Sequence, residues 1–335
     1  MDSRGNETRI GMGASIPIAN PRFDGNELKY LTECVETGWL THTGRFEAAF
    51  ERAFSEKFGA PCMATSSGTG ALHVALLSLG IGPGDAVIIP NLTFGATASV
   101  VVAVGAKPIL VDVSPRTWGL DPELVRRRVT RRTRAIIPVH IYGEDAGDFR
   151  QFGIPVIEDA CESLGFVPLR GLMTCYSFYG NKIITTGEGG MICGDFGDAR
   201  EWRNGGFDKD YLCQLPGLNY RMTNMQAAIG LAQLERFDSL IGVRKRNLEI
   251  YNRRLKGKGK WLFVAEMDDP MGAAETLRYN GVSSRPVFPP LHRSPAFRYY
   301  ATGSFPVSDS IYEHGLALPT DATPEQTNFI CDLLQ

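Results

Sequence analysis

A single lysine, Lys182, stands between a short apolar segment and the glycine-rich turn Gly187-Glu188-Gly189-Gly190. The amine of a lysine can condense with an aldehyde such as pyridoxal 5′-phosphate to give a Schiff base, and the cofactor then stores electrons that a side chain cannot store. Most lysines are ordinary surface residues, so Lys182 taken alone favours no chemistry. The residues around Lys182 favour the interpretation that it forms a Schiff base.

Two carboxylates, Glu158 and Asp159, follow the apolar run Ile154-Pro155-Val156-Ile157, which is typical of a short buried strand. Open α/β sheets place their chemistry at this edge. A carboxylate beside a pyridine nitrogen keeps that nitrogen protonated, so the ring can withdraw electrons from a substrate. We therefore expect Asp159 to face a cofactor ring. A solvent-facing carboxylate at a strand end is the alternative.

A loop of small residues, Thr65 to Gly70, leads into an apolar helical stretch. Main-chain N–H groups at a helix start favour a phosphate dianion, helped by the helix dipole and by Ser or Thr hydroxyls. Ordinary helix capping also uses these residue types. Each of the three signals is weak alone, but together, in the order phosphate loop, carboxylate and lysine, they favour a cofactor site.

These elements resemble the DegT/StrS-type sugar aminotransferases, which are pyridoxal-phosphate enzymes with the aspartate aminotransferase (fold type I) architecture. The resemblance covers most of the chain, and its matching segments are 67–69, 90–94, 138–143, 158–160, 182, 187–190, 217–224, 281–288 and 290–292. It implies an α/β fold, with a mostly parallel sheet flanked by helices and a smaller α+β C-terminal domain.

The resemblance also assigns roles to residues that contact the cofactor. Gly68, Thr69 and Ser177 would bind its phosphate, and Phe94 would stack on its ring, although core packing is the ordinary role of such an aromatic residue. Lys182 would form the Schiff base and Asp159 would face the pyridine nitrogen.

The resemblance also assigns roles to Glu162 and Asn219, for which other interpretations stay open. Glu162 stands near the cofactor's phenolic oxygen, where the family frequently has glutamine, and a carboxylate there would repel a phenolate unless it is protonated or turned away. Asn219 would reach the phosphate of the neighbouring subunit, so the resemblance implies a homodimer with shared active sites. A turn or capping asparagine is the alternative.

The substrate contacts expected from the resemblance are His140, Arg285 and His292. The guanidinium of Arg285 suits a substrate phosphate or a donor carboxylate, because its fork pairs with two oxygens. A structural histidine and a surface ion pair are the competing interpretations.

The reaction that the resemblance implies transfers an amino group from glutamate to a nucleotide-linked 4-keto-6-deoxy sugar, with GDP-4-keto-6-deoxymannose as the first candidate, which would give GDP-perosamine. Another NDP-keto-sugar, linked to dTDP or UDP or carrying a 3-keto group, is an alternative, as is a pyridoxal-phosphate-binding protein without turnover. A pyridoxamine-dependent 3-dehydratase would have histidine in place of Lys182.

Composition is compatible with a cytoplasmic enzyme. Net charge is -2 and no long basic block occurs, so we expect no nucleic-acid partner, and we interpret the arginines at 126–128 and 131–132 as a solvated helix face. The seven cysteines are scattered without a C-x-x-C pair, which favours a reducing compartment and no metal site. The polar start, Met1 to Glu7, predicts no signal peptide, and no segment is long enough to span a membrane.

Apolar runs at 86–90, 108–112, 135–139 and 154–157 are typical of strands buried on both faces, and helical patterns occupy 26–37, 45–58 and 222–255. The break at Lys256 to Lys260 predicts a large domain at 1–255 and a small one at 256–335. Three connections, 143–153, 165–175 and 262–281, are shorter than the family pattern implies. The first must cross between strands with little helix.

Overall fold

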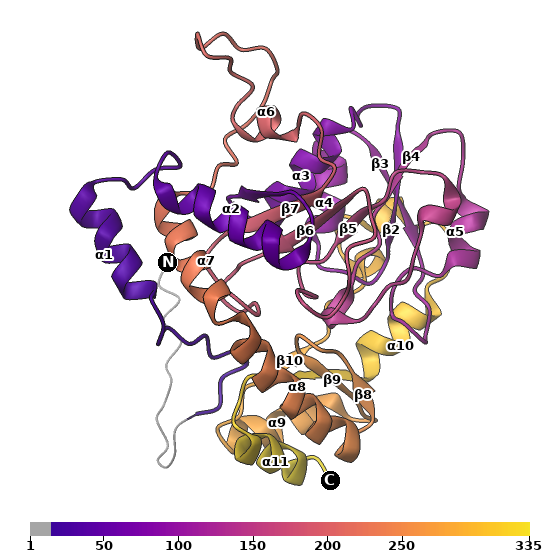
Figure 1. Ribbon diagram of the computed structural model, residues 1–335. Coiled ribbons are helices and arrows are strands. Elements are labelled where there is room, and N and C mark those ends of the chain that lie inside the picture. The colour runs from indigo at the N-terminus through magenta and orange to yellow at the C-terminus, as the bar shows by residue number, and fades with distance from the viewer. Residues whose placement is uncertain (1–14) are drawn as a thin grey trace, which may run out of the picture.

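The computed structural model describes residues 15–335, and Figure 1 shows its arrangement. The polar start for which we expect no signal peptide lies outside these residues. The α-helices are α1 (Glu27–Thr37), α2 (Arg45–Phe58), α3 (Gly68–Ser78), α4 (Ala96–Ala103), α5 (Pro122–Arg128), α6 (Ala199–Arg203), α7 (Asn224–Glu235), α8 (Phe237–Arg254), α9 (Pro270–Tyr279), α10 (Pro306–His314) and α11 (Pro324–Leu333). The strands are β1 (Cys62–Thr65), β2 (Ala86–Pro90), β3 (Lys107–Val111), β4 (Thr133–Ile136), β5 (Ile157–Asp159), β6 (Met173–Ser177), β7 (Gly190–Gly194), β8 (Gly257–Lys258), β9 (Phe263–Glu266), β10 (Arg285–Pro286) and β11 (Gly315–Leu318).

The main sheet has the order β3-β2-β4-β5-β6-β7-β1, in which parallel bridges from Ile136 to Val156 and from Val139 to Asp159 join its two parts. The pairs β2–β3, β2–β4 and β5–β6 are parallel, whereas β7 runs antiparallel to both of its neighbours. The mostly parallel sheet predicted from the apolar runs is confirmed. The predicted strand at 154–157 begins later, at Ile157, and ends on Asp159.

Helices cover both faces of this sheet. Side chains along a strand alternate between the two faces, so each strand contributes to the packing on both sides. On β7, Ile192 packs with α3 and α4, whereas Met191 packs on the opposite face with α2 and α7. Helix α2 buries Phe46, Phe50 and Phe54 at a spacing of four residues. Gly230 of α7 lets the two helices approach closely, since an added Cβ would lie 2.7 Å from the Phe50 ring.

A second, antiparallel sheet has the order β10-β11-β9-β8 and lies with α9 and α11 at the lower end of the molecule in Figure 1. Its core includes Leu248 and Tyr251 from α8, which therefore contributes to this smaller unit as well. The predicted helical stretch 222–255 is divided at Arg236 into α7 and α8. The division of the chain into domains at 255/256 stays a proposal.

The shortened crossover at 143–153 contains no α-helix. Only two single-turn 3₁₀ helices, η1 (Ile141–Gly143) and η2 (Arg150–Phe152), lie along this connection, as its length predicts. Further 3₁₀ turns are η3 (Leu291–Arg293) and η4 (Arg298–Tyr300). The guanidinium of Arg170 binds both carboxylate oxygens of Asp145, at 2.7 and 2.5 Å. Two of the shortened connections are therefore tied to one another.

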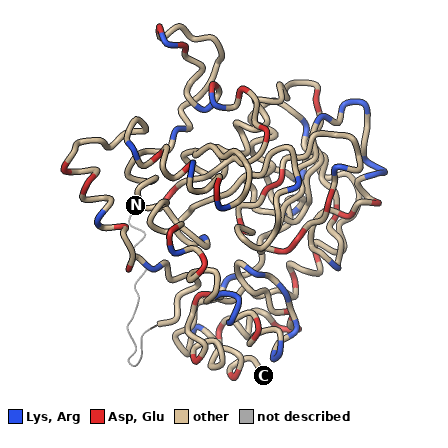
Figure 2. The backbone as a smooth tube through the Cα atoms, in the orientation of Figure 1, with Lys and Arg blue, Asp and Glu red and all other residues tan. Residues whose placement is uncertain are grey.

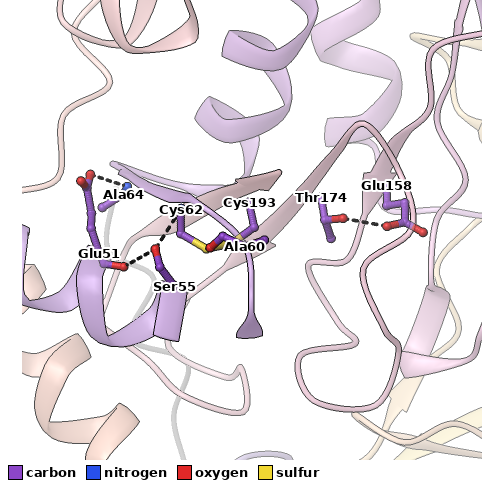
Figure 3. The surroundings of a disulfide bond; sticks show 8 residues. All are labelled: Glu51, Ser55, Ala60, Cys62, Ala64, Glu158, Thr174 and Cys193. Atoms are coloured by element: carbon purple, nitrogen blue, oxygen red, sulfur yellow. Dashed lines mark hydrogen bonds between the residues drawn. A yellow bond between two sulfur atoms is a disulfide. The ribbon is translucent and has the colours of Figure 1, made fainter. Parts of the chain in front are cut away.

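A disulfide joins Cys62 of β1 to Cys193 of β7, a pairing that the scattered cysteines did not predict (Figure 3). The two residues are direct partners in the antiparallel register, with their Cα atoms 4.2 Å apart. Ser55 of α2 accepts a hydrogen bond from the Cys62 N–H at 3.0 Å. The remaining cysteines are free, namely Cys34, Cys161, Cys175, Cys213 and Cys331.

Acidic and basic residues are interspersed along the described chain (Figure 2). Arg126 and Arg127 of α5 are exposed, in agreement with a solvated helix face. None of the helices in residues 15–335 combines the length and the apolarity needed to cross a bilayer.

Candidate active site

A cavity of about 480 Å³ opens where β5 and β6 end and α3 begins. Parallel strands gather their carboxyl ends at one edge, so Asp159 and Ser177, the last residues of β5 and β6, reach the same cavity. It brings together eight of the residues predicted from the sequence: Gly68, Thr69, Phe94, Asp159, Glu162, Ser177, Lys182 and Arg285.

The side chain of Lys182 is largely buried, with 13% of it exposed. Its Nζ lies 3.4 Å from Oε1 of Glu162 and 3.8 Å from the ring centre of Trp261. The main-chain N–H of Lys182 donates to the carbonyl of Tyr179 at 2.9 Å, which closes the turn after β6. The loop thus directs one amine into the cavity.

Asp159 is buried, and hydrogen bonds fix both of its carboxylate oxygens. Thr97 of α4 donates its hydroxyl to Oδ2 at 2.8 Å, and the N–H of Cys161 donates to Oδ1 at 3.2 Å. Thr97 itself lies 3.0 Å from the hydroxyl of Thr93. Asp159 therefore presents a negative charge in a set orientation on the cavity wall.

Glu162 is also buried, and its Oε2 accepts a hydrogen bond of 2.7 Å from the N–H of Tyr142. Burial raises the pKa of this carboxyl above its usual value, although the neighbouring Lys182 partly opposes the shift. The carboxyl is thus easier to protonate than an exposed glutamate.

The start of α3 forms a cradle for an anion. Ser67 caps the helix by accepting a hydrogen bond from Gly70 N–H, and the N–H groups of Gly68 and Thr69 have no partner within the first turn. An added Cβ at Gly68 would lie 2.8 Å from both Cys161 Sγ and Ser177 Cβ. Only glycine leaves this cradle open, so the residues fit a bound phosphate.

Phe94 is 59% exposed at the cavity, which is unlike an ordinary core aromatic residue. Its ring lies 5.6 Å from Phe288, and Phe288 in turn stacks on Tyr142 at 5.4 Å. Arg285 lines the same cavity from β10, in the second sheet.

The two histidines lie outside the cavity. His140 is fully buried beneath it, where Nδ1 accepts from the N–H of Ala146 at 3.1 Å and Nε2 lies 3.4 Å from Glu158. His292 contacts Asn91 at 2.9 Å and Asp309 at 3.3 Å. In this subunit both residues hold loops together.

Asn219 is exposed and does not line the cavity of its own subunit. It forms an isolated bridge with Asn204 at the base of the loop 205–218, which projects from the top of the molecule in Figure 1. The exposed side chains of Phe207, Tyr211, Leu212 and Leu218 lie on this loop.

Comparison with known proteins decides the class of protein. The family model for DegT/DnrJ/EryC1/StrS aminotransferases matches residues 21–335. The chain belongs to this family. The resemblance inferred from the separate motifs is therefore confirmed, and the chain is an enzyme of the aminotransferase class.

Individual members of the family are similar over nearly the whole chain. A GDP-perosamine synthase of Caulobacter vibrioides is 41% identical, covering 92% of this chain and 93% of that protein. A GDP-perosamine synthase of Vibrio cholerae is 34% identical, covering 96% and 98%. The solved structure of a DegT DnrJ EryC1 StrS aminotransferase from Brucella abortus is 27% identical, covers 92% and 94%, and superposes with a TM-score of 0.86. The predicted fold type I architecture is thereby confirmed.

Sequence reasoning missed Trp261, which lines the cavity, and Thr97, which lies behind the cavity wall and binds Asp159. Trp261 follows the Lys- and Gly-rich break that we interpreted only as a boundary, and its contact with Lys182 spans a long stretch of chain. Thr97 lies in a run of small apolar residues with no motif around it. Tyr142 was part of a matching motif, but its hydrogen bond to Glu162 had no signal in the sequence.

Proposed function

We propose that this aminotransferase moves an amino group from glutamate to a nucleotide-linked 4-keto-6-deoxy sugar. GDP-4-keto-6-deoxymannose is the first candidate substrate, since two relatives of nearly equal length are GDP-perosamine synthases. Its cofactor is pyridoxal phosphate. The observation that carries the proposal is the meeting of Lys182 and Asp159 in one cavity with an open phosphate cradle.

Pyridoxal phosphate, when bound, supplies an aldehyde that takes up the donor's amino group and a ring that withdraws electrons. Lys182 would hold the aldehyde covalently. Its amine, once released, would move a proton to and from the reacting carbon. Asp159 would hold a proton on the ring nitrogen, because its negative charge favours the charged form of that nitrogen.

The remaining contacts would orient the cofactor. Gly68, Thr69 and Ser177 would bind the phosphate, and Phe94 would cover one face of the ring from its exposed position. Glu162 would face the phenolic oxygen and can do so without repulsion when it is protonated, which its burial favours. Arg285 would pair with an anionic group of the substrate.

The assembly that we propose is a homodimer, in which Asn219 of the partner subunit would complete the phosphate site. The exposed apolar side chains on the loop 205–218 support a covered surface there. We also propose a cytoplasmic location, supported by the free thiols, although the Cys62–Cys193 disulfide departs from that pattern.

Reaction with glutamate tests the function. Mixing the purified, cofactor-loaded protein with glutamate should change the visible absorbance of the bound cofactor. Adding a panel of GDP-, dTDP- and UDP-linked keto sugars should restore it for one of them. Lys182→Ala should abolish the response, and Lys107→Ala, on the exposed start of β3, should leave it intact. An inert wild-type spectrum would favour the binding-only alternative.

A mixing experiment tests the shared site. Lys182→Ala and Asn219→Ala chains should each be impaired alone, because each damages every site of its own dimer. A mixed dimer would contain one site with both native residues, so mixing should restore part of the activity. Impaired variants that stay impaired after subunit exchange would argue against a shared site.

A further inference from the structure

We propose that Trp261 is a positioning residue for Lys182. Together with Glu162 it forms a docking site that holds the lysine amine whenever this amine is not joined to the cofactor. The inference rests on the proposed role of Lys182, and it adds a residue from the segment after 255 to the site.

Trp261 contacts both Lys182 and the residue before it. The indole N–H donates a hydrogen bond of 2.9 Å to the carbonyl of Asn181, the residue just before Lys182. The face of the same ring lies under the Lys182 amine, with Nζ 3.8 Å from its centre. One side chain thus contacts both the main chain just before Lys182 and the end of the lysine side chain. An ammonium group over an indole face is attracted by the ring's quadrupole.

The indole cannot easily move. Trp261 is 2% exposed, and its ring stacks on Tyr142 at 6.2 Å with planes 16° apart. The main-chain N–H of Trp261 donates a hydrogen bond of 2.9 Å to the carbonyl of Tyr142. Its main-chain carbonyl accepts a hydrogen bond from the hydroxyl of Thr320. Contacts with Tyr142 in η1 and with Thr320, just after β11, therefore hold Trp261 where the amine meets its ring.

Glu162 forms the second wall of the docking site. Its Oε1 lies 3.4 Å from Nζ, while its Oε2 is fixed by the N–H of Tyr142. Tyr142 thus supports both walls, because it binds Glu162 through its N–H and Trp261 through its carbonyl. The docking site is one connected structure.

Such a site has a use in transamination. The donor displaces the lysine, whose amine must then stay within reach of the reacting carbon. A free lysine side chain has many rotamers, and holding it near one geometry avoids that entropy loss during the reaction. Trp261 would therefore affect the rate of the proton transfer more than the binding of glutamate.

The test compares Trp261→Leu, which removes the ring, with Trp261→Phe, which keeps a ring but loses the N–H. Trp202→Leu, a tryptophan on α6 that does not line the cavity, is the control. The first readout is the acylation rate of Lys182 in the cofactor-free chain, measured by peptide mass spectrometry against exposed Lys107. We expect about a tenfold faster reaction of Lys182 in Trp261→Leu, a smaller change in Trp261→Phe and none in Trp202→Leu.

The second readout is steady-state kinetics of the loaded enzyme. Trp261→Leu should lower kcat about tenfold while KM for glutamate stays within about twofold, and Trp261→Phe should recover part of kcat. Unchanged Lys182 acylation in Trp261→Leu would overturn the docking site, as would equal changes in kcat and KM. If Trp261→Leu fails to fold, Trp261→Phe and Glu162→Gln must each still speed acylation of Lys182, and the proposal is wrong if either variant leaves the rate unchanged.

The proposed function and the proposed docking site can be contradicted independently of one another. A wild-type enzyme that does not respond to glutamate would remove the proposed function, whereas acylation of Lys182 would still report on the docking site. A responsive enzyme with unchanged acylation in every variant would remove the docking site alone.

Discussion

The N–H of Tyr142 donates a 2.7 Å hydrogen bond to Oε2 of Glu162, and this bond links the start of the shortened crossover to the carboxylate that lies beside Lys182. Tyr142 adopts a left-handed conformation with φ of 52°, which is uncommon for a residue with a side chain. Its ring is fully buried between Trp261 and Phe288. The packing on both sides therefore maintains a backbone conformation that directs the N–H at Glu162.

Replacing Glu162 with Gln should change how stability depends on pH. Burial raises the pKa of Glu162 above its usual 4.5, so the folded protein holds this proton more tightly than the unfolded chain. The stabilisation from that proton is fully present below pH 4.5 and is lost as pH rises through the folded-state value. Glutamine has no such loss, so Glu162→Gln should gain stability relative to wild type as pH rises above 4.5. Urea unfolding at several pH values measures this, and a pH-independent difference would contradict it.

Replacing Asp145 with Asn should loosen the two shortened connections. The bidentate contact with Arg170 lowers the pKa of Asp145 to about 2, so its stabilisation is present above pH 3.8 and is lost as pH falls towards 2. The carboxylate is partly exposed, so the loss at neutral pH should be at most about 1 kcal/mol. Asp148→Asn is the matched control, because Asp148 binds Arg150 within the same connection. Equal losses of unfolding free energy in the two variants would speak against a tie between the connections.

Replacing Gly68 with Ala should weaken cofactor binding. The new methyl group would lie 2.8 Å from Cys161 Sγ and Ser177 Cβ and would narrow the phosphate cradle. We expect at least a tenfold higher Kd for pyridoxal phosphate by fluorescence titration. Gly82→Ala is the control, since its nearest neighbour would be the Val104 carbonyl at an ordinary 3.7 Å. A Gly68→Ala protein that binds the cofactor as tightly as wild type would show that the phosphate lies elsewhere.

Local patterns predicted much of the fold. Strand β2 spans the expected 86–90, and α2 spans the expected 45–58, because continuous apolar runs and phenylalanines at four-residue spacing are strong periodic signals. The motif residues Lys182 and Asp159 share the cavity because Asp159 ends β5 and Lys182 follows β6, and these parallel strands end at the same edge of the sheet.

Features that depend on distant partners could not be predicted in this way. Trp261 lies between β8 and β9, far from Lys182 in the chain, and only the fold brings its ring under the lysine amine. Cys62 meets Cys193 through a strand register that scattered cysteines do not reveal. His140 occupies a matching motif, yet only the fold shows that its ring is turned to Glu158 beneath the cavity.

Locating the cofactor on the chain tests the central claim most directly. Borohydride reduction of the loaded protein should fix the cofactor to the lysine that holds it, and peptide mass spectrometry then identifies that lysine. The account predicts the added mass on Lys182 alone. The added mass on any other lysine, or none on Lys182 in a protein that has bound the cofactor, would contradict it.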